Sequence, residues 1–235
     1  MINHGNGRDL VKRKYYEAYD DRYRQVHSQK LQWFDDKPTG IVGEVISKYG
    51  ITRDHKLLEL GCGEGRDAFA LISAGFDLVA TDISSAAIMF CQNKHPEHSN
   101  HFKILDCVAG KLDCKFDFIY AVAVVHMLVE DEDRSAFYAF IREHLTVDGI
   151  ALICTMGDGE IERQTDIHTA FDLQRRTHEK TGREVQIAST SCRVVSFATF
   201  EDELKHNGFK ILEMGMTNAA PDFPMLMYSV TSREL

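Results

Sequence analysis

Short apolar segments alternate with longer amphipathic ones between residues 39 and 155 of this 235-residue chain. The apolar segments have the length of buried strands, and the amphipathic ones carry apolar residues at helical spacing. This alternation predicts an α/β fold, a doubly wound and mostly parallel sheet with helices on both faces. The expected strands are 57–60, 77–81, 102–105, 116–121 and 149–155, and the expected helices are 39–49, 64–74, 84–93 and 131–145.

The two ends of the chain depart from this alternation. Residues 8–27 carry Leu10, Val11 and several tyrosines at helical spacing, which predicts a helix within an N-terminal cap segment, residues 1–37. At the other end, a helix over 200–207 and strands over 210–216 and 225–230 are expected to complete the sheet.

Residues 157–195 form a polar stretch longer than an ordinary connection, with a helix expected over 167–180. An insertion after the fifth strand of such a sheet lies near the carboxyl ends of the strands, where ligands bind. We therefore expect a lid or a specificity element, and a plain surface elaboration is the alternative.

The composition of the chain argues against nucleic acid and membranes as binding partners. A net charge of −9, with no basic cluster denser than 12–14, argues against nucleic acid. No apolar segment approaches the roughly 20 residues that span a bilayer, and the N-terminus lacks an apolar signal core. Six cysteines without a C-x-x-C pair favour free thiols and a cytoplasmic protein. We expect a single domain over 1–235, and oligomeric state is not predicted.

A metal site is not expected. His95, His98 and His101 are spaced three apart, but Pro96 interrupts any helix that would bring them to one face. A solvated loop is the simpler interpretation of this segment.

The most informative segment is Lys56-Leu-Leu-Glu-Leu-Gly-Cys-Gly-Glu-Gly65, in which a strand ends at Glu59 and Leu60 and glycine then occupies every second position. Glycine accepts positive φ and has no Cβ, so this loop can turn sharply and bring its backbone against a ligand. Strand, glycine loop and following helix together predict a nucleotide cradle.

Three further segments lie at the carboxyl ends of predicted strands. Asp82, followed by Ile83, ends the second strand, where an acidic residue accepts the ribose hydroxyls of an adenosine. Asp106 and Cys107 end the third strand, where a carboxylate can accept from an adenine amino group. The fourth strand ends in backbone carbonyls directed toward the cradle.

These four segments, in this order and spacing, resemble the motifs of class I S-adenosylmethionine-dependent methyltransferases over residues 38–155. Within that class they are most similar to small-molecule enzymes of the tellurite-resistance and thiopurine type. The resemblance implies a seven-stranded sheet with the last strand antiparallel. It also implies that S-adenosyl-L-methionine is the cofactor and S-adenosyl-L-homocysteine the product.

The resemblance also assigns roles to residues. Glu59, Gly61, Cys62, Gly63 and Gly65 hold the methionine part of the cofactor, Asp82 and Ile83 the ribose, Asp106 and Cys107 the adenine, and the Ala121 carbonyl the amino group. A nicotinamide-binding fold is the nearest rival. It requires glycine where Arg66 stands and gives Asp106 no role.

The acceptor is a small molecule whose identity the sequence does not give. His126, after the fourth strand, is the candidate general base, and packing is the alternative. The resemblance suggests that the cap closes over the cofactor, with Tyr19, Tyr23 and Trp33 as candidate contacts, although aromatic residues at helical spacing also serve in packing. Methyl transfer is the predicted activity, and the alternative is a non-catalytic regulator that binds S-adenosylmethionine.

Two particular kinds of acceptor have weaker support. Asp158 and Glu160 could bind an amine or a guanidine, or they could form a turn. Cys154 and Cys192 could bind a soft metalloid, but the sequence does not set their separation.

Overall fold

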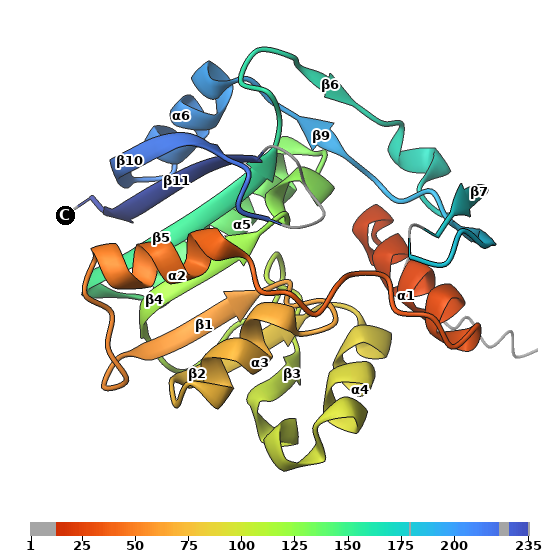
Figure 1. The fold of residues 1–235 in the computed structure, drawn as a ribbon. Helices are drawn as coiled ribbons and strands as arrows, with labels where there is room; N and C mark the ends of the chain where they lie inside the picture. Colours follow the sequence, from red (N-terminus) through yellow and green to blue (C-terminus); the bar gives the residue numbers. More distant parts are fainter. Residues whose placement is uncertain (1–12, 179, 221–225, 235) are drawn as a thin grey trace, which may run out of the picture.

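A seven-stranded sheet runs through the computed structural model, which describes residues 13–178, 180–220 and 226–234 (Figure 1). The strand order is β10-β11-β5-β4-β1-β2-β3. β11 is antiparallel to both of its neighbours, and the remaining neighbouring pairs are parallel, which confirms the predicted topology. The strands are β1 (Lys56–Leu60), β2 (Asp77–Asp82), β3 (Phe102–Ile104), β4 (Phe116–Val122), β5 (Leu145–Met156), β10 (Phe209–Thr217) and β11 (Leu226–Arg233).

Helices cover both faces of the sheet. One face packs against α2 (Gly40–Lys48), α3 (Arg66–Ser73) and α4 (Ser85–Lys94), and the other against α5 (Asp131–His144) and α6 (Phe197–His206). The five helices expected over 39–49, 64–74, 84–93, 131–145 and 200–207 therefore form, within a few residues of their predicted ends. Short 3-10 turns, η2 (Pro96–His101) and η3 (Val125–Met127), follow α4 and β4.

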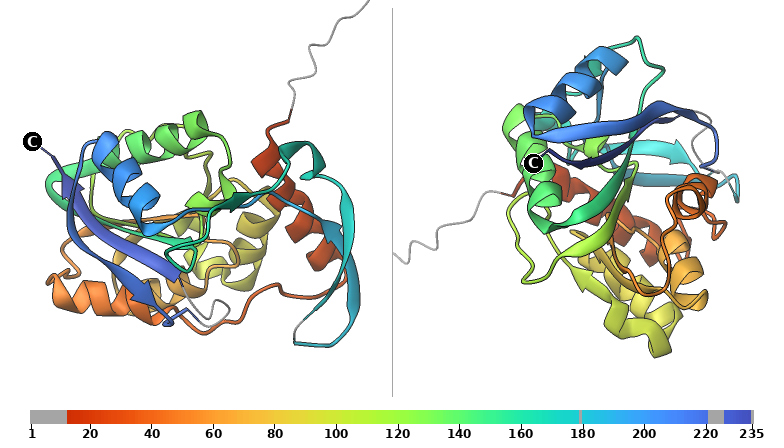
Figure 2. Two further views of the ribbon diagram at one scale, coloured as in Figure 1. Left: turned by 90° about the horizontal axis from the view of Figure 1, so that it is seen from above. Right: turned by 90° about the vertical axis from the view of Figure 1, so that its left-hand side faces the viewer.

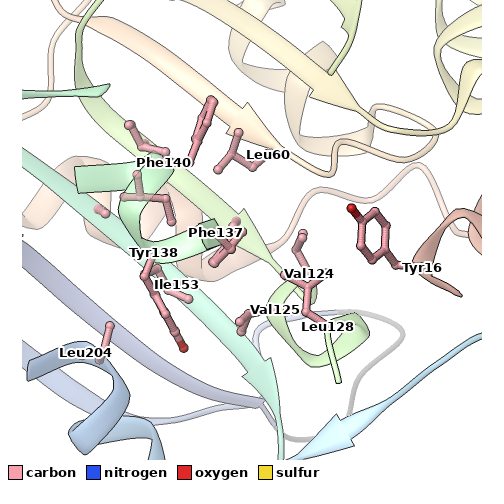
Figure 3. Packing of buried hydrophobic residues seen from close by; sticks show 14 of the residues in the cluster. Tyr16, Leu60, Val124, Val125, Leu128, Phe137, Tyr138, Phe140, Ile153 and Leu204 are labelled. Atoms are coloured by element: carbon pink, nitrogen blue, oxygen red, sulfur yellow. The ribbon is translucent and has the colours of Figure 1, made fainter. Parts of the chain in front are cut away.

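The central strands β1, β4 and β5 are mostly apolar because both of their faces are buried. Leu57 packs in the core on the α2–α4 side, whereas its neighbour Leu58 packs in the core on the α5–α6 side. Figure 3 shows the second of these cores, in which Val124, Val125 and Leu128 lie beyond the end of β4. The residues after β4 are thus fixed by packing on one side, and this positions them at the edge where the strands end.

The N-terminal cap lies across the carboxyl ends of the strands (Figures 1 and 2). It consists of η1 (Tyr15–Glu17) and α1 (Ala18–Ser28), and the predicted Leu10 and Val11 lie outside the described residues. Asp20 on α1 fixes it to the start of α4, where it accepts hydrogen bonds from the Ser84 hydroxyl at 2.8 Å and from the Ala86 N–H at 3.0 Å.

The helix predicted over 167–180 is wrong. Among the described residues of this range only η4 (Ile167–Thr169) is helical, and it is followed by a hairpin of β7 (Leu173–Thr177) and β8 (Glu184–Ala188). The alternation in β8 buries Val185 and Ile187 against Val26 of α1, so a period-two strand is stabilised by a distant partner. A second pair, β6 (Arg163–Gln164) and β9 (Arg193–Val194), joins the two ends of the insertion.

Strand β5 and helix α6 both begin before their predicted first residues. β5 begins at Leu145, directly after α5, four residues before its predicted start. α6 begins at Phe197 because the Ser196 side chain caps it by accepting from the Thr199 N–H. In the described ranges, no helix combines the length and apolar character that crossing a membrane requires.

Candidate functional site

The glycine loop lies at the carboxyl end of β1 and is shaped by close contacts. Gly61 and Gly63 have φ of +71° and +52°. A Cβ at Gly61 would approach the Val124 side chain to 2.4 Å, and one at Gly63 would approach the Tyr23 hydroxyl to 2.6 Å. The absence of side chains at these positions therefore leaves room for β4 and the cap to close around the loop.

Asp82 connects the end of β2 to this loop. Its carboxylate accepts hydrogen bonds from the N–H of Gly63 and from that of Ser84, each at 2.8 Å. Burial raises the pKa of Asp82 to about 6, and these two hydrogen bonds oppose the rise. The carboxylate is thus held in a fixed position, with a protonation state that changes near pH 6.

Glu59 lies beneath the loop at the end of β1. The Tyr120 hydroxyl donates to its carboxylate at 3.0 Å, and burial, followed by the charge of Asp67, raises its pKa well above the usual value. Asp67 in turn accepts from the N–H and the hydroxyl of Thr39, which joins α3 to the start of α2. Two buried acidic side chains therefore line the floor of the site.

Asp106 and Cys107 follow β3 on the neighbouring side. The Asp106 carboxylate accepts from the Val108 N–H at 2.8 Å and from the Tyr16 hydroxyl at 3.2 Å. Burial raises the pKa of the Cys107 thiol to about 12, so it stays a neutral thiol at physiological pH. The cap thus contacts the third strand as well as the glycine loop.

These elements enclose what we term the inner cavity. Ten of the predicted residues line it, together with others that the sequence did not single out. The predicted ones are Tyr19, Tyr23, Glu59, Gly61, Cys62, Gly63, Asp82, Ile83, Asp106 and Cys107. The others include Tyr16, Phe34, Glu64, Arg66, Asp67, Val122, Ala123, Val124 and Met127.

Four predicted residues do not line the inner cavity. Gly65, the N-cap of α3, faces Phe69 and Cys91 beneath the loop. Ala121 is fully buried within β4, and the residues after it, Val122, Ala123 and Val124, line the cavity instead. Ala123 has φ of +57°, a strained conformation for a residue with a side chain, and no sequence signal indicates it.

The other two, Trp33 and His126, line an adjacent cavity of about 520 Å³, which we term the outer cavity. Its remaining lining comes from the cap, from Met127 after β4, from Met156 at the end of β5 and from the insertion. Tyr19, Phe34 and Met127 line both cavities, so the two spaces adjoin at these side chains.

His126 is 4% exposed in η3. Burial, followed by the positive charges of Arg134 and Arg22, lowers its pKa to about 3. The imidazole is therefore neutral across the physiological range.

The insertion is held against the cap by buried polar contacts. Nε2 of His178 lies 2.7 Å from the Gln32 carbonyl, and its Nδ1 lies 2.8 Å from the Thr181 hydroxyl. The Tyr19 hydroxyl donates to the Ser191 carbonyl at 2.8 Å. These contacts make the insertion a wall of the outer cavity.

Of the other polar candidates, Asp158, Glu160 and Cys154 line neither cavity. Asp158 accepts from the N–H groups of Glu160 and Ile161, which defines a turn. Cys154 is fully buried in β5, whereas Cys192 lines the outer cavity, so the two thiols do not share a cavity wall. No three His, Cys, Asp or Glu side chains within the described ranges are arranged to hold a metal ion.

Two solved structures with this architecture are named as methyltransferases. An S-adenosylmethionine-dependent methyltransferase from Clostridium acetobutylicum superposes with a TM-score of 0.66 at 14% identity, covering 94% of this chain and 99% of that one. The 1,6-didemethyltoxoflavin-N1-methyltransferase of Burkholderia thailandensis, with its substrate and S-adenosylhomocysteine bound, superposes with a TM-score of 0.69 at 15% identity, covering 94% and 89%. The fold is that of the class I S-adenosylmethionine-dependent methyltransferases, as the resemblance implied.

The sequence comparison narrows the class to a family. The model of the family described as tellurite resistance protein TehB matches residues 26–179. This match spans more than half of the sequence, and the chain belongs to the TehB family. The probable S-adenosyl-L-methionine-dependent methyltransferase TehB of Haemophilus influenzae is 31% identical over 131 residues. That alignment covers 54% of this chain and 46% of the relative, so the chain spans about half the length of the relative.

Proposed function

We propose that this protein binds S-adenosyl-L-methionine in the inner cavity and transfers its methyl group to a small molecule held in the outer cavity. The observation that carries the proposal is the junction of the two cavities at Tyr19, Phe34 and Met127. Donor and acceptor sites that adjoin in this way suit an in-line displacement. A non-catalytic regulator would need no second cavity of this size.

The residues of the inner cavity suit the groups of this cofactor. Asp82 is a fixed carboxylate that can accept from two ribose hydroxyls, and the glycine loop offers backbone N–H groups to the methionine part. Asp106 and Cys107 line the same cavity next to Leu105 and Val108, where an adenine ring would find apolar walls. At the end of β4, we assign contact with the amino group to the backbone that follows Ala121.

The bound cofactor supplies an electrophilic methyl group, and its sulfur leaves with the electron pair of the broken bond as S-adenosyl-L-homocysteine. The protein chiefly aligns the acceptor and excludes water, and alignment of this kind can contribute on the order of 7–11 kcal/mol. The acceptor nucleophile loses its proton to water or to a base. His126 was the predicted base and lines the outer cavity, but a pKa of about 3 makes its imidazole a weak proton acceptor near neutral pH, so we favour water as the acceptor of the proton and packing as the role of His126.

Calorimetric titration with S-adenosyl-L-methionine tests the cofactor assignment. We expect binding by the wild type and a loss of at least about tenfold in Asp82→Ala, because the variant lacks the ribose acceptor. Asp77→Ala is the matched control, since Asp77 lies at the exposed start of the same strand. Absence of binding by the wild type, or equal binding by Asp82→Ala, would contradict the proposal.

Six cysteines that are all free thiols support a reducing compartment, and we propose that the protein acts in the cytoplasm. The cap, residues 1–37, and the insertion, residues 157–195, would then serve as the parts of the domain that close over the two ligands.

A further inference from the structure

The outer cavity is positively charged. Arg22 from α1 and Arg176 from β7 line it, and its other ionisable side chains are Tyr19, His126, His178 and Cys192. Within the described part of the chain, no Asp or Glu lines this cavity. A cavity with two guanidinium groups and no carboxylate disfavours a cationic guest and stabilises an anionic one.

Arg22 is held in place without neutralisation. Its Nη2 donates to the Ser189 carbonyl at 2.8 Å and to the Thr190 hydroxyl at 2.5 Å, and Nε and Nη2 both contact the Ala188 carbonyl. These partners are neutral, and no ion pair of Arg22 or Arg176 is found among residues 13–178, 180–220 and 226–234. Nη1 makes no hydrogen bond within these ranges, so its two hydrogens remain available to a guest.

The surroundings of Arg22 also favour an anionic guest. Burial lowers the pKa of Arg22, and the positive charge of Arg176 lowers it further. The fold therefore keeps two like charges near each other. The guanidinium also lies over the rings of Tyr19 and Trp33, at 5.2 and 5.4 Å from their centroids. Its plane is thereby fixed, so the hydrogens of Nη1 have a set direction in which they can donate to a carboxylate oxygen.

On this basis, and resting on the proposed function, we infer that the acceptor is an organic molecule bearing a carboxylate, which Arg22 and Arg176 bind while its methylated atom points toward Tyr19 and Met127. The size of the cavity supports an organic acid, because about 520 Å³ lies within the range of sites for drug-sized ligands and greatly exceeds the need of a small inorganic oxyanion.

Matched pairs of acids and amides test this inference. The protein, saturated with S-adenosyl-L-homocysteine, is titrated by calorimetry with 4-hydroxybenzoate, indole-3-acetate and glutarate, and with the corresponding amides. We expect at least one acid to bind about tenfold or more tightly than its amide, since the amide keeps the shape but lacks the charge. Trp33, the single tryptophan of the chain, provides a second readout for glutarate, which does not absorb near its emission.

Arg176→Gln is the decisive variant, because Arg176 is exposed and we expect its replacement to leave the fold intact. It should reduce the preference for the acid to less than about threefold and leave S-adenosyl-L-homocysteine binding unchanged. Arg175→Gln is the matched control: Arg175 is the neighbouring residue of β7, is exposed and does not line the cavity, so the preference should persist. Arg22→Gln should also reduce the preference for the acid over its amide.

Three outcomes would overturn the inference while leaving the proposed function intact. The first is equal binding of acids and amides. The second is no binding of any of the three acids by protein that binds S-adenosyl-L-homocysteine. The third is an equal effect of Arg176→Gln and Arg175→Gln on the preference for the acid. If Arg176→Gln instead weakens S-adenosyl-L-homocysteine binding, the charge serves the cofactor and the inference is wrong. Failure of the wild type to bind S-adenosyl-L-homocysteine would refute the proposed function itself.

Discussion

The backbone N–H of Trp33 donates to Oε1 of Glu64 at 2.8 Å. The other oxygen of the same carboxylate accepts from the Phe34 N–H at 2.8 Å, and Nε2 of His27 lies 2.8 Å from Oε1. Glu64 is 3% exposed and lies between the second and third glycines of the loop. The loop that forms the cofactor cradle therefore also holds the cap that closes it.

Glu64→Gln should loosen the cap. The amide keeps one acceptor but directs N–H groups toward the donors of the cap, and an unsatisfied buried donor costs about 1–3 kcal/mol. We expect faster tryptic cleavage within residues 13–37, a red shift of Trp33 emission and weaker binding of S-adenosyl-L-homocysteine. Glu44→Gln, an exposed change on α2, is the control. Unchanged cleavage would show that other contacts, such as those of Asp20, are sufficient to hold the cap.

Cofactor affinity should depend on pH through Asp82. Its pKa of about 6 means that lowering the pH protonates the carboxyl and removes an acceptor for the ribose hydroxyls. At pH 5 such a group is ionised in only about one molecule in eleven, so affinity for S-adenosyl-L-homocysteine should fall about tenfold between pH 7 and 5. Calorimetry at several pH values checks this. Asp82→Asn should bind weakly with a flat profile, and a wild-type profile equally flat would contradict the assignment.

The stability of the protein should fall on the acid side because of His126. Its pKa is lowered to about 3 in the folded state, so between about pH 6.5 and 3 the unfolded chain binds the additional proton. This proton uptake lowers the free energy of unfolding by about 2 kcal/mol between pH 7 and 5. Asp82 acts in the opposite direction, since its raised pKa stabilises the fold at low pH and that contribution is lost as the pH rises through about 6.

Urea unfolding of the wild type and His126→Gln at pH 7 and 5 isolates the histidine. The variant should lose about 2 kcal/mol less than the wild type over this interval, because it has no proton to gain on unfolding. Identical losses in the two proteins would mean that the imidazole of the folded protein titrates normally, and the buried neutral state would then be wrong.

The sequence predicts the sheet well because its signals are local. Leu57 and Leu58 indicate a strand buried on both faces, and Gly63 and Asp82 follow or end consecutive strands, where the topology must bring them together. The role of Glu64 escapes such reasoning, because its contact with Trp33 joins residues 31 positions apart. A glutamate within a glycine loop carries no local sign of a partner in the cap.

The prediction of a helix within the insertion is wrong for a related reason. The hairpin of β7 and β8 is stabilised where Val185 and Ile187 meet Val26 of α1, and neither segment alone indicates this contact. The outer cavity, with Arg22 from one element and Arg176 from the other, exists only after that docking. Chemistry at the ends of consecutive strands can thus be predicted from sequence, whereas an acceptor site assembled from distant segments requires the structure.

Arg134 of α5 should be among the residues on which stability depends most. It is 1% exposed, and its Nε and Nη2 form a bidentate pair with Glu203 of α6 at 2.7 and 2.6 Å. Its Nη1 donates to the carbonyls of Val125 and Leu128, which flank His126 in η3. One guanidinium thus joins two helices and supports a wall of the outer cavity.

Arg134→Met should destabilise the protein by about 3–5 kcal/mol, because Glu203 is left as an unpaired charge in a largely buried position. The double variant Arg134→Met/Glu203→Leu should recover part of this loss, since it removes the stranded carboxylate as well. Urea unfolding followed by circular dichroism measures both. A double variant less stable than the single one would show that the packing of the two side chains, rather than their charges, dominates at this contact.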